Sequence, residues 1–189
     1  MKSNIRMLSD SVTIGDSRYD INTDFLVWIE IEHLFFDKTC DECIRLAKIL
    51  TLAYPILPPD PFQAVRGIMW FYSGGKYKDD EDSKPASNLP YYDLTEDFDY
   101  VWGAFMAEFG IDLTQCNMHW WKFKALLACL SDECKFSKIV GYRSMDTSSI
   151  KDKDLKGFYE KMKKRFRLSR TLDEDIKESL VATSLEGLF

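Results

Sequence analysis

Two histidines, His33 and His119, are the only side chains in the sequence whose unperturbed charge changes near neutral pH. General acid–base catalysis would need one of them beside a carboxylate or a nucleophile. Each histidine lies within an apolar helical pattern, which favours a packed or capping histidine. Gly-rich phosphate loops, nucleophile elbows and the His-Glu-x-x-His zinc sequence do not occur in the sequence. We therefore expect no enzymatic activity, no catalytic residue and no cofactor.

Four of the five cysteines could together bind a metal. Cys40 and Cys43 form a C-x-x-C pair, Cys129 and Cys134 form a looser pair, and Cys116 stands alone. Four thiolates could hold zinc tetrahedrally. The alternative is that the thiols pack as small hydrophobes, since Cys43 falls on the apolar stripe of its predicted helix and Cys129 lies in another apolar segment. We prefer packed, reduced thiols and expect no metal site.

Charge is unevenly distributed along the chain, whose 25 basic and 31 acidic residues give a net charge of −6. The acidic clusters, at residues 79–82 and 93–99, lack the ligand spacing of a calcium loop. Residues 151–170 hold nine basic and three acidic side chains, a local charge of +6. This basic segment indicates either a solvated helix face or a surface that meets a partner. Its aromatic residues fall on the predicted core side, which disfavours nucleic-acid binding.

The overall composition indicates one folded domain of 189 residues, because 46% of them are apolar and 14% aromatic. No apolar run approaches the roughly 20 residues that cross a bilayer. Met1 to Asp10 lacks the apolar block of a secretory signal. We therefore expect a soluble protein that stays in the cytoplasm in which it is made, with no membrane partner.

Apolar periodicity, caps and turn residues predict a mainly α-helical single domain of six or seven helices with a small N-terminal β-hairpin. The hairpin turns at Gly15-Asp16-Ser17. A mobile acidic loop is expected at about 75–90 and an appended C-terminal helix at about 171–186. The predicted helices cover residues 25–36, 39–54, 61–73, 93–109, 118–130 and 155–166, with a short helical turn at 136–140.

Several details of these helices can be tested. Asn22 or Thr23 is expected to cap the first helix, although its sequence also fits a strand, and Thr39 is expected to open a capping box. Asp60 followed by Pro61 is expected to cap and start the third helix, and Gly110 is expected to end the fourth long helix in a left-handed conformation. The sets expected to face inward are Phe25, Leu26, Ile29, His33 and Phe36; Phe62, Val65, Met69 and Tyr72; and Leu155, Phe158, Tyr159, Met162 and Phe166.

Five short blocks, spread from the hairpin to Leu168, together resemble a known family. They are Ile21-Asn22-Thr23-Asp24-Phe25, Asp97-Phe98-Asp99-Tyr100, Phe109-Gly110-Ile111-Asp112-Leu113, His119-Trp120-Trp121-Lys122-Phe123 and Ile139-Val140-Gly141-Tyr142-Arg143. The sequence is similar to the bacteriophage "gene product fifteen" family of long-tailed phages and prophages of Gram-positive bacteria. The double tryptophan and the Gly-Tyr-Arg sequence are the most specific parts of the resemblance. The long acidic loop and the helix after Leu168 depart from it.

The resemblance implies a helical architecture and a place in the tail-morphogenesis module. Genes of this family typically lie between those of the major tail protein and the tape-measure protein, which is the usual position of tail-assembly chaperones. The family has no established catalytic residues, so the resemblance supplies none. The expected function is that of a non-enzymatic chaperone that binds the tape-measure protein, in the cytoplasm of the bacterial host, before the tail tube polymerises.

Other partners and functions stay open at this point. The major tail protein is a second candidate partner, and the chain could form a homo-oligomer. A minor structural component of the phage tail is the first alternative function. A thiol-zinc or nucleic-acid-binding regulatory protein is the second.

The candidate partner-binding residues are Trp120, Trp121, Lys122, Tyr142 and Arg143. Consecutive positions on a helix are about 100° apart, so the first three cannot all face one core. One tryptophan is therefore expected to face away from that core. The alternative is that both tryptophans are buried between neighbouring helices.

Overall fold

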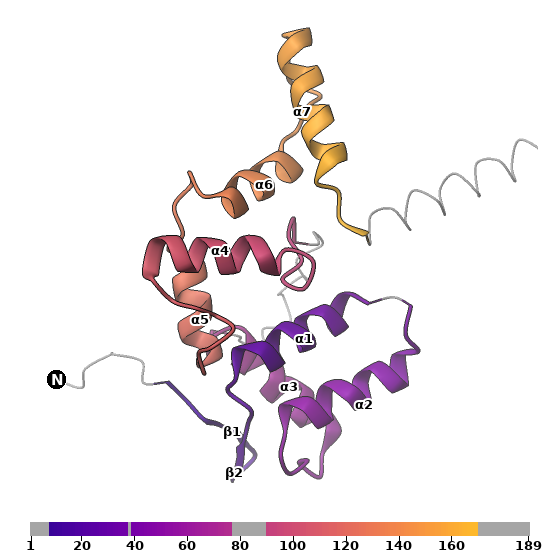
Figure 1. Cartoon of the computed structure of the whole chain (residues 1–189). Coiled ribbons are helices and arrows are strands. Elements are labelled where there is room, and N and C mark those ends of the chain that lie inside the picture. The colour runs from indigo at the N-terminus through magenta and orange to yellow at the C-terminus, as the bar shows by residue number, and fades with distance from the viewer. Residues whose placement is uncertain (1–7, 38, 77–89, 170–189) are drawn as a thin grey trace, which may run out of the picture. The chain divides into compact units, whose positions relative to one another are not determined.

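The computed structural model describes residues 8–37, 39–76 and 90–169. Within these ranges the chain forms seven helices and one two-stranded antiparallel hairpin (Figure 1). The strands are β1 (Ser11–Ile14) and β2 (Ser17–Asp20), and the helices are α1 (Phe25–Phe36), α2 (Glu42–Ala53), α3 (Pro61–Tyr72), α4 (Phe98–Phe109), α5 (Trp120–Leu127), α6 (Lys135–Ser144) and α7 (Lys153–Arg165). The prediction of a mainly α-helical fold with an N-terminal hairpin is confirmed.

The chain divides into two compact units, which are described separately. The first unit comprises residues 1–89 and 105–129, and the second comprises residues 90–104 and 130–189. The chain crosses from the second unit to the first within α4. That the two units form a single domain stays a prediction.

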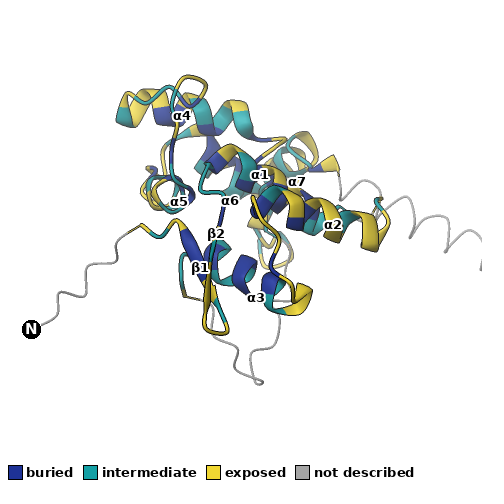
Figure 2. Cartoon of the chain, turned by 90° about the horizontal axis from the view of Figure 1, so that it is seen from below, coloured by how far each residue is buried: buried dark blue, intermediate teal, exposed yellow. Residues whose placement is uncertain are grey.

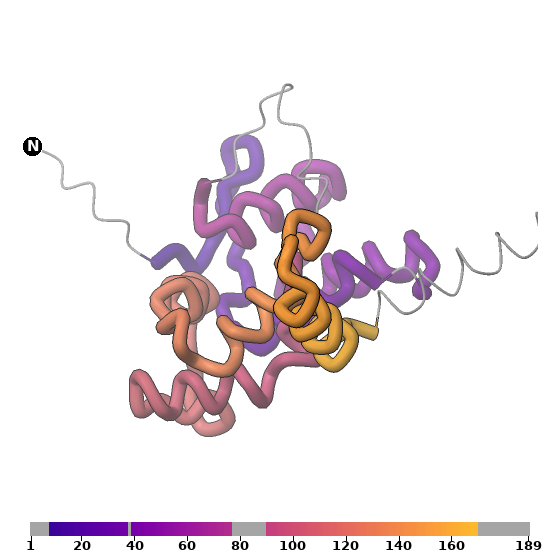
Figure 3. The backbone as a smooth tube through the Cα atoms, turned by 90° about the horizontal axis from the view of Figure 1, so that it is seen from above, coloured from indigo at the N-terminus to yellow at the C-terminus, as the bar shows by residue number. Residues whose placement is uncertain are grey.

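The hairpin of the first unit turns at Gly15, whose φ of 59° falls in the left-handed region that glycine adopts without strain. Val12 pairs with Tyr19 across the two strands. Strand β1 packs beside α3 (Figure 3). Gly67 of α3 permits this approach, because a Cβ atom there would lie 3.1 Å from Cγ2 of Val12 and 2.5 Å from the hydroxyl oxygen of Tyr54.

The core of the first unit is a stack of aromatic rings from four helices. The rings of Phe25 and Phe123 lie 4.9 Å apart, and those of Phe105 and Phe123 lie 5.3 Å apart. Trp28 stacks on Phe71 at 4.9 Å. All five of these side chains are fully buried. Figure 2 shows the buried positions on α1 and α3, whereas α2 is exposed along most of its length.

The first helix is confirmed as a helix, and its predicted inward face is correct only in part, since Phe25 and Ile29 are buried. Trp28 and Ile31 are buried, whereas Leu26 and His33, which were expected to face inward, are exposed. Burial on α1 extends around more of the helix than one stripe, so a single-face pattern could not locate it.

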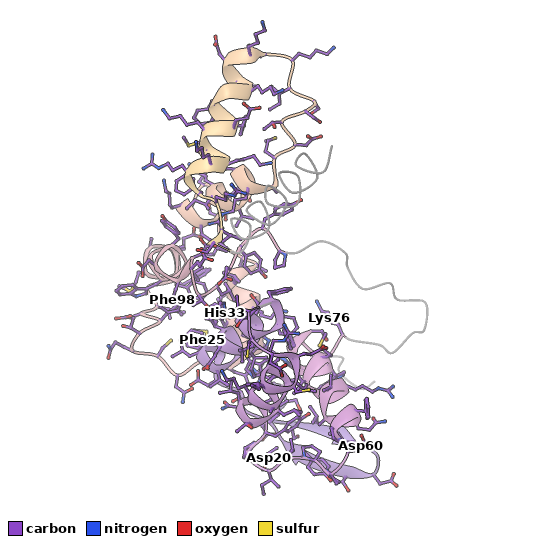
Figure 4. All side chains as sticks on the ribbon, turned by 90° about the vertical axis from the view of Figure 1, so that its right-hand side faces the viewer. Asp20, Phe25, His33, Asp60, Lys76 and Phe98 are labelled. Carbon is purple, nitrogen blue, oxygen red and sulfur yellow. The ribbon has the colours of Figure 1, made fainter. Side chains whose placement is uncertain are left out.

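Aspartates cap the first three helices. The side chain of Asp24 accepts from the Leu26 N–H, so the predicted cap at Asn22 or Thr23 is wrong. Asp41, and not Thr39, caps α2. Asp60 caps α3 as predicted, with Pro61 in the first helical position, and Figure 4 shows Asp60 at this end of the helix. Aspartate caps these helices because its carboxylate accepts hydrogen bonds from N–H groups of the first turn. Its negative charge is also stabilised by the positive end of the helix dipole.

The buried face of α3 is not the apolar stripe that was predicted for it. Ala64, Gly67, Ile68 and Phe71 are the buried residues, whereas Phe62 has 84% of its surface exposed. The reason is the close approach of β1 at Gly67, which places that side of the helix against the hairpin. The stripe Phe62, Val65, Met69 and Tyr72 is therefore not the core face.

Backbone hydrogen bonds set where α4 ends and where α5 begins. Gly110, with a φ of 66°, ends α4 as predicted, and the Ile111 N–H donates to the Phe105 carbonyl. Helix α5 is shorter than the predicted 118–130. The Met118 carbonyl accepts from the Phe25 N–H instead of starting the helix, so α5 begins at Trp120.

In the second unit, α6 is a ten-residue helix and not the short turn expected at 136–140. Helix α7 follows it and packs on α6. No residue of α7 is buried, and Leu155 and Phe158 are about half exposed. The prediction that α7 carries its apolar residues into the core is therefore wrong. Figures 1 and 4 show the first half of α7 extending past α6, so no helix in the described part of the second unit covers the apolar residues of that half.

Two sequence predictions concern residues that the structure leaves undescribed. The acidic loop at about 75–90 lies outside the described residues except at its two ends, and the helix at about 171–186 lies wholly outside them. Among the described helices, none combines the length and the apolar character that crossing a bilayer requires.

Candidate functional site

His119 positions the double tryptophan at the start of α5. Its Nδ1 accepts a hydrogen bond from the Trp121 N–H at 3.0 Å, which caps the helix. In the neutral ring Nε2 then carries the proton and donates it to the Ser9 carbonyl at 2.9 Å. The preferred interpretation of His119 as a capping or packed histidine is confirmed. His33 is exposed on α1.

Both indoles of the double tryptophan bind the last carbonyls of α3. Trp120 donates from Nε1 to the Tyr72 carbonyl at 3.1 Å, and Trp121 donates from Nε1 to the Phe71 carbonyl at 2.7 Å. A helix leaves such carbonyls without intrahelical partners. The two indoles therefore join α5 to the end of α3.

Lys124 adds a cation to the same helix end. Its Nζ donates to the Tyr72 carbonyl at 3.0 Å and lies 4.6 Å from the centre of the Tyr72 ring. Burial lowers the pKa of Lys124, and the nearby carboxylate of Glu32 opposes this shift. Tyr72 in turn donates its hydroxyl proton to Glu32 at 2.5 Å. These groups form a partly buried polar network that joins α1, α3 and α5.

The three predicted site residues of α5 differ in how they meet solvent. Trp120 is fully buried, Trp121 is half-buried, and Lys122 is exposed. The ring of Trp121 lies 5.6 Å from that of Trp70, and Gly75 leaves room for both indoles. Both tryptophans thus have structural contacts. Their role in binding a partner stays a prediction, with Lys122 and the exposed part of Trp121 as the accessible groups.

Arg143 ties together three segments of the second unit. Its guanidinium binds the carboxylate of Asp97 through two hydrogen bonds, of 2.6 and 2.9 Å. The Asp97 side chain is 2% exposed and that of Arg143 is 10% exposed, so this ion pair is buried. Arg143 also donates to the carbonyls of Tyr91 and Phe166. It therefore fixes the chain that follows α7 against the start of α4.

Tyr142 supports α7 by ring contacts. Its ring stacks on Phe166 at 6.1 Å and meets the edges of Phe158 and Tyr159 at 6.1 and 6.3 Å. Tyr142 and Arg143 thus position α7 within the second unit. Trp120, Trp121 and Lys122 belong to the first unit, so each group of predicted site residues is assembled within its own unit.

Helix α7 carries an exposed apolar surface, and we call this helix the α7 arm (Lys153–Arg165). Leu155 is 48% and Phe158 is 46% exposed, and they lie three positions apart on one helical face. The arm holds six basic and two acidic side chains. The sequence located its basic charge but not its exposure, because amphipathic periodicity is the same for a helix that faces a core and one that faces a partner.

A second exposed apolar surface is the corner between α2 and α3, which we call the α2–α3 corner (Ile56, Leu57 and Phe62). Their exposed fractions are 78%, 53% and 84%. Pro55, Pro58, Pro59 and Pro61 surround these residues, and prolines keep the segment extended. The neighbouring prolines are the sequence signal that could have indicated exposed apolar side chains at this corner.

The cysteines do not pack as expected. Cys43 and Cys129 are both exposed, which overturns their interpretation as buried small hydrophobes. Cys43 lies in the first turn of α2, whereas burial on that helix starts at Ile49. All five thiols are free, and no group of three or more potential metal ligands gathers within the described ranges.

A protein-family model matches most of the chain. The model described as Bacteriophage Gp15 protein matches residues 6–168, which includes the double tryptophan, Tyr142, Arg143 and the α7 arm. No match to the chain was found among curated proteins or among solved structures.

Proposed function

Because the chain belongs to the bacteriophage Gp15 protein family, we propose that it acts as a tail-assembly chaperone, without enzymatic activity, that binds the tape-measure protein before the tail tube polymerises. A tape measure is a long, largely helical and partly apolar polypeptide. Its apolar helical surface must be covered until tube subunits surround it. A protein that does this needs apolar surface of its own that is available to a helix.

The α7 arm is the observation that carries this proposal. It is a 13-residue helix without a buried residue, and its apolar face is half exposed. Exposed apolar side chains grouped on one element are typical of surfaces that bind another chain. Leu155 and Phe158 offer the contacts by which amphipathic helices pair, and the adjacent lysines can meet acidic groups of the partner.

The arm is held ready by the second unit. Tyr142 packs against Phe158, Tyr159 and Phe166, and Arg143 binds the backbone just after the helix. A helix fixed in advance loses less conformational entropy on binding than a free segment does. In this proposal Tyr142 and Arg143 contribute to binding by positioning the arm and not by touching the partner.

Co-expression with the tape-measure protein tests the proposal. We expect the tape measure to become soluble and to co-purify with this chain. The double variant Leu155→Ser with Phe158→Ser should lose both effects. A matched control is Leu26→Ser with Met106→Ser, because Leu26 and Met106 are 47% and 46% exposed on other helices. The control should keep both effects.

Two outcomes would contradict the proposal. One is a tape measure that is equally insoluble with and without this chain. The other is recovery of this chain in stoichiometric amounts from mature particles by mass spectrometry, which would instead favour a minor structural component of the tail. Binding to the major tail protein can be scored in the same co-expression.

A further inference from the structure

Positive charge borders the exposed apolar strip of the α7 arm on both sides. The strip consists of Leu155 and Phe158, each about half exposed. Because successive helix positions are about 100° apart, two cations fall on the Leu155 side of the strip and two on the Phe158 side. They are Lys156 and Lys163 on the Leu155 side, and Lys161 and Arg165 on the Phe158 side.

The two cations on the Leu155 side already have partners within the chain. The Nζ atom of Lys156 lies 3.9 Å from the carboxylate of Glu160, one helical turn further on. The Nζ atom of Lys163 donates to the Met145 carbonyl at 2.7 Å. This side of the strip therefore has little positive charge left for another molecule.

The two cations on the Phe158 side are not neutralised in this way. Lys161 and Arg165 are both exposed. Among the residues that the structure describes, no acidic side chain forms an ion pair with either of them. The Arg165 guanidinium lies 5.4 Å from the centre of the Phe166 ring, a contact that does not cancel its charge. The uncompensated positive charge next to the strip is thus on the Phe158 side.

Charge on the Phe158 side also changes along the helix. Asp154 is exposed on that side, in the first turn, where the helix dipole stabilises its carboxylate. It precedes Lys161 by seven positions, which is about 10 Å along the helix axis. The Phe158 side is therefore negative where α7 begins and positive over its second half.

We propose that the α7 arm binds a partner helix whose apolar face is bordered on one side by carboxylates, and that these carboxylates meet Lys161 and Arg165. This inference rests on the proposed function, since it names the chemistry of the segment that the arm binds. The partner's apolar face would cover Leu155 and Phe158. Ion pairs at the border of such a contact fix the orientation of the two helices and select the partner more than they add affinity.

Other anionic surfaces fit the arm less well. Nucleic acid has no apolar face to cover the strip, and the net charge of −6 opposes a polyanion. A helix that lies in a lipid surface buries its whole apolar face. On α7 the ring of Tyr142 occupies part of that face, through its contacts with Phe158 and Phe166.

Calorimetric titration of the full chain with capped amphipathic helical peptides tests the inference. Three peptides of equal length share one leucine face, and the positions that border this face are glutamate, glutamine or lysine. We expect the glutamate peptide to bind about tenfold more tightly than the glutamine peptide, and the lysine peptide to bind most weakly.

Reversing the charge of the Phe158 side should reverse this preference. Single exposed ion pairs are weak, so both cations are changed together in Lys161→Glu with Arg165→Glu. The double variant should bind the glutamate peptide about tenfold more weakly than the unaltered chain does, and the lysine peptide more tightly.

The matched control is Lys153→Glu with Lys164→Glu. It makes the same change in net charge on the same helix, but both positions lie on the face opposite Leu155. The control should keep most of the affinity for the glutamate peptide. Circular dichroism melting checks that both double variants are folded.

The inference is overturned if the glutamate and glutamine peptides bind equally, or if the two folded double variants lose the same affinity. Tighter binding of hexathymidylate or of phosphatidylglycerol vesicles than of the glutamate peptide would also overturn it. So would a dimer of the chain, detected by sedimentation, that Leu155→Ser with Phe158→Ser dissociates, because a second copy would then cover the strip.

Failure of the inference is distinguishable from failure of the proposed function. If the glutamate peptide binds as expected but the tape measure does not co-purify, the proposed function is contradicted and the preference of the arm for acidic helices stands. If the tape measure co-purifies equally with the unaltered chain and with Lys161→Glu, Arg165→Glu, the inference alone is contradicted.

Discussion

Arg143 and Asp97 form a buried ion pair whose partners lie 46 positions apart in the sequence. Arg143→Met should lower the free energy of unfolding by about 3–5 kcal/mol, because it leaves the Asp97 carboxylate buried without its charge partner. Urea denaturation followed by circular dichroism measures this loss.

The matched control for Arg143 is Glu160→Gln, which breaks the exposed pair with Lys156 on α7. Its free energy of unfolding should stay close to that of the unaltered protein. Equal stability of the Arg143→Met and Glu160→Gln proteins would show that Arg143 does not hold the second unit together.

Tyr54 is expected to lower the free energy of unfolding at alkaline pH. Its hydroxyl is buried and donates to the Ala64 carbonyl at 2.8 Å, and burial raises its pKa well above the usual value of 10.0. The unfolded chain ionises this group above about pH 10 while the folded chain keeps its proton. The contribution of Tyr54 to the free energy of unfolding is therefore constant below about pH 10 and falls as the pH rises further.

Tyr54→Phe should flatten this alkaline loss, at a cost of about 1 kcal/mol near neutral pH for the missing hydrogen bond. Urea midpoints measured at pH 7, 9, 10.5 and 11 give the comparison. Tyr91→Phe, at a residue 47% exposed, should keep the pH profile of the unaltered protein. An unchanged profile for Tyr54→Phe would contradict the assignment.

Sequence reasoning succeeded for residues whose role is local. The capping at His119 and Asp60 and the left-handed end at Gly110 depend on neighbours within a few positions. The contact of Arg143 with Asp97 could not be predicted, because nothing local marks a pair joined only by folding. For the same reason the sequence could not assign the double tryptophan to the end of α3.

Glycines on two helices test how closely the elements pack. Gly67→Ala should destabilise the protein by about 1–3 kcal/mol, because the added Cβ would meet the Tyr54 hydroxyl at 2.5 Å and Val12 at 3.1 Å. Gly103→Ala adds a methyl group to α4 where nothing lies within 4 Å, and should stabilise by about 0.5–1 kcal/mol. Thermal melting of the two variants measures both effects, and a Gly67→Ala protein at least as stable as the unaltered protein would contradict the packing of β1 on α3.

The same packing explains where the helix stripes were predicted incorrectly. Burial of Gly67 and Ala64 on α3 requires small residues, which an apolar stripe of large side chains does not detect. On α7 the stripe itself is real, but only part of it meets α6. Periodicity identifies an apolar face and not the surface that covers it.

For the molecule as a whole, composition and helix signals were enough for the fold class, and five short blocks were enough for the family. The two exposed apolar surfaces were not predicted, because both consist of residues that normally fill a core. The proposed function therefore depends on structure at this point. Membership of the phage family follows from the sequence. The proposal that the α7 arm is the binding element follows from the exposure of its apolar side chains.

Hydrogen exchange of the backbone amides, with and without co-purified tape-measure protein, tests this account most directly. We predict slower exchange in the complex across Lys153–Arg165, with the largest change around Leu155 and Phe158. The aromatic core of the first unit should exchange at an unchanged rate. A complex that forms while exchange in α7 stays the same would contradict the claim that this helix binds the tape measure.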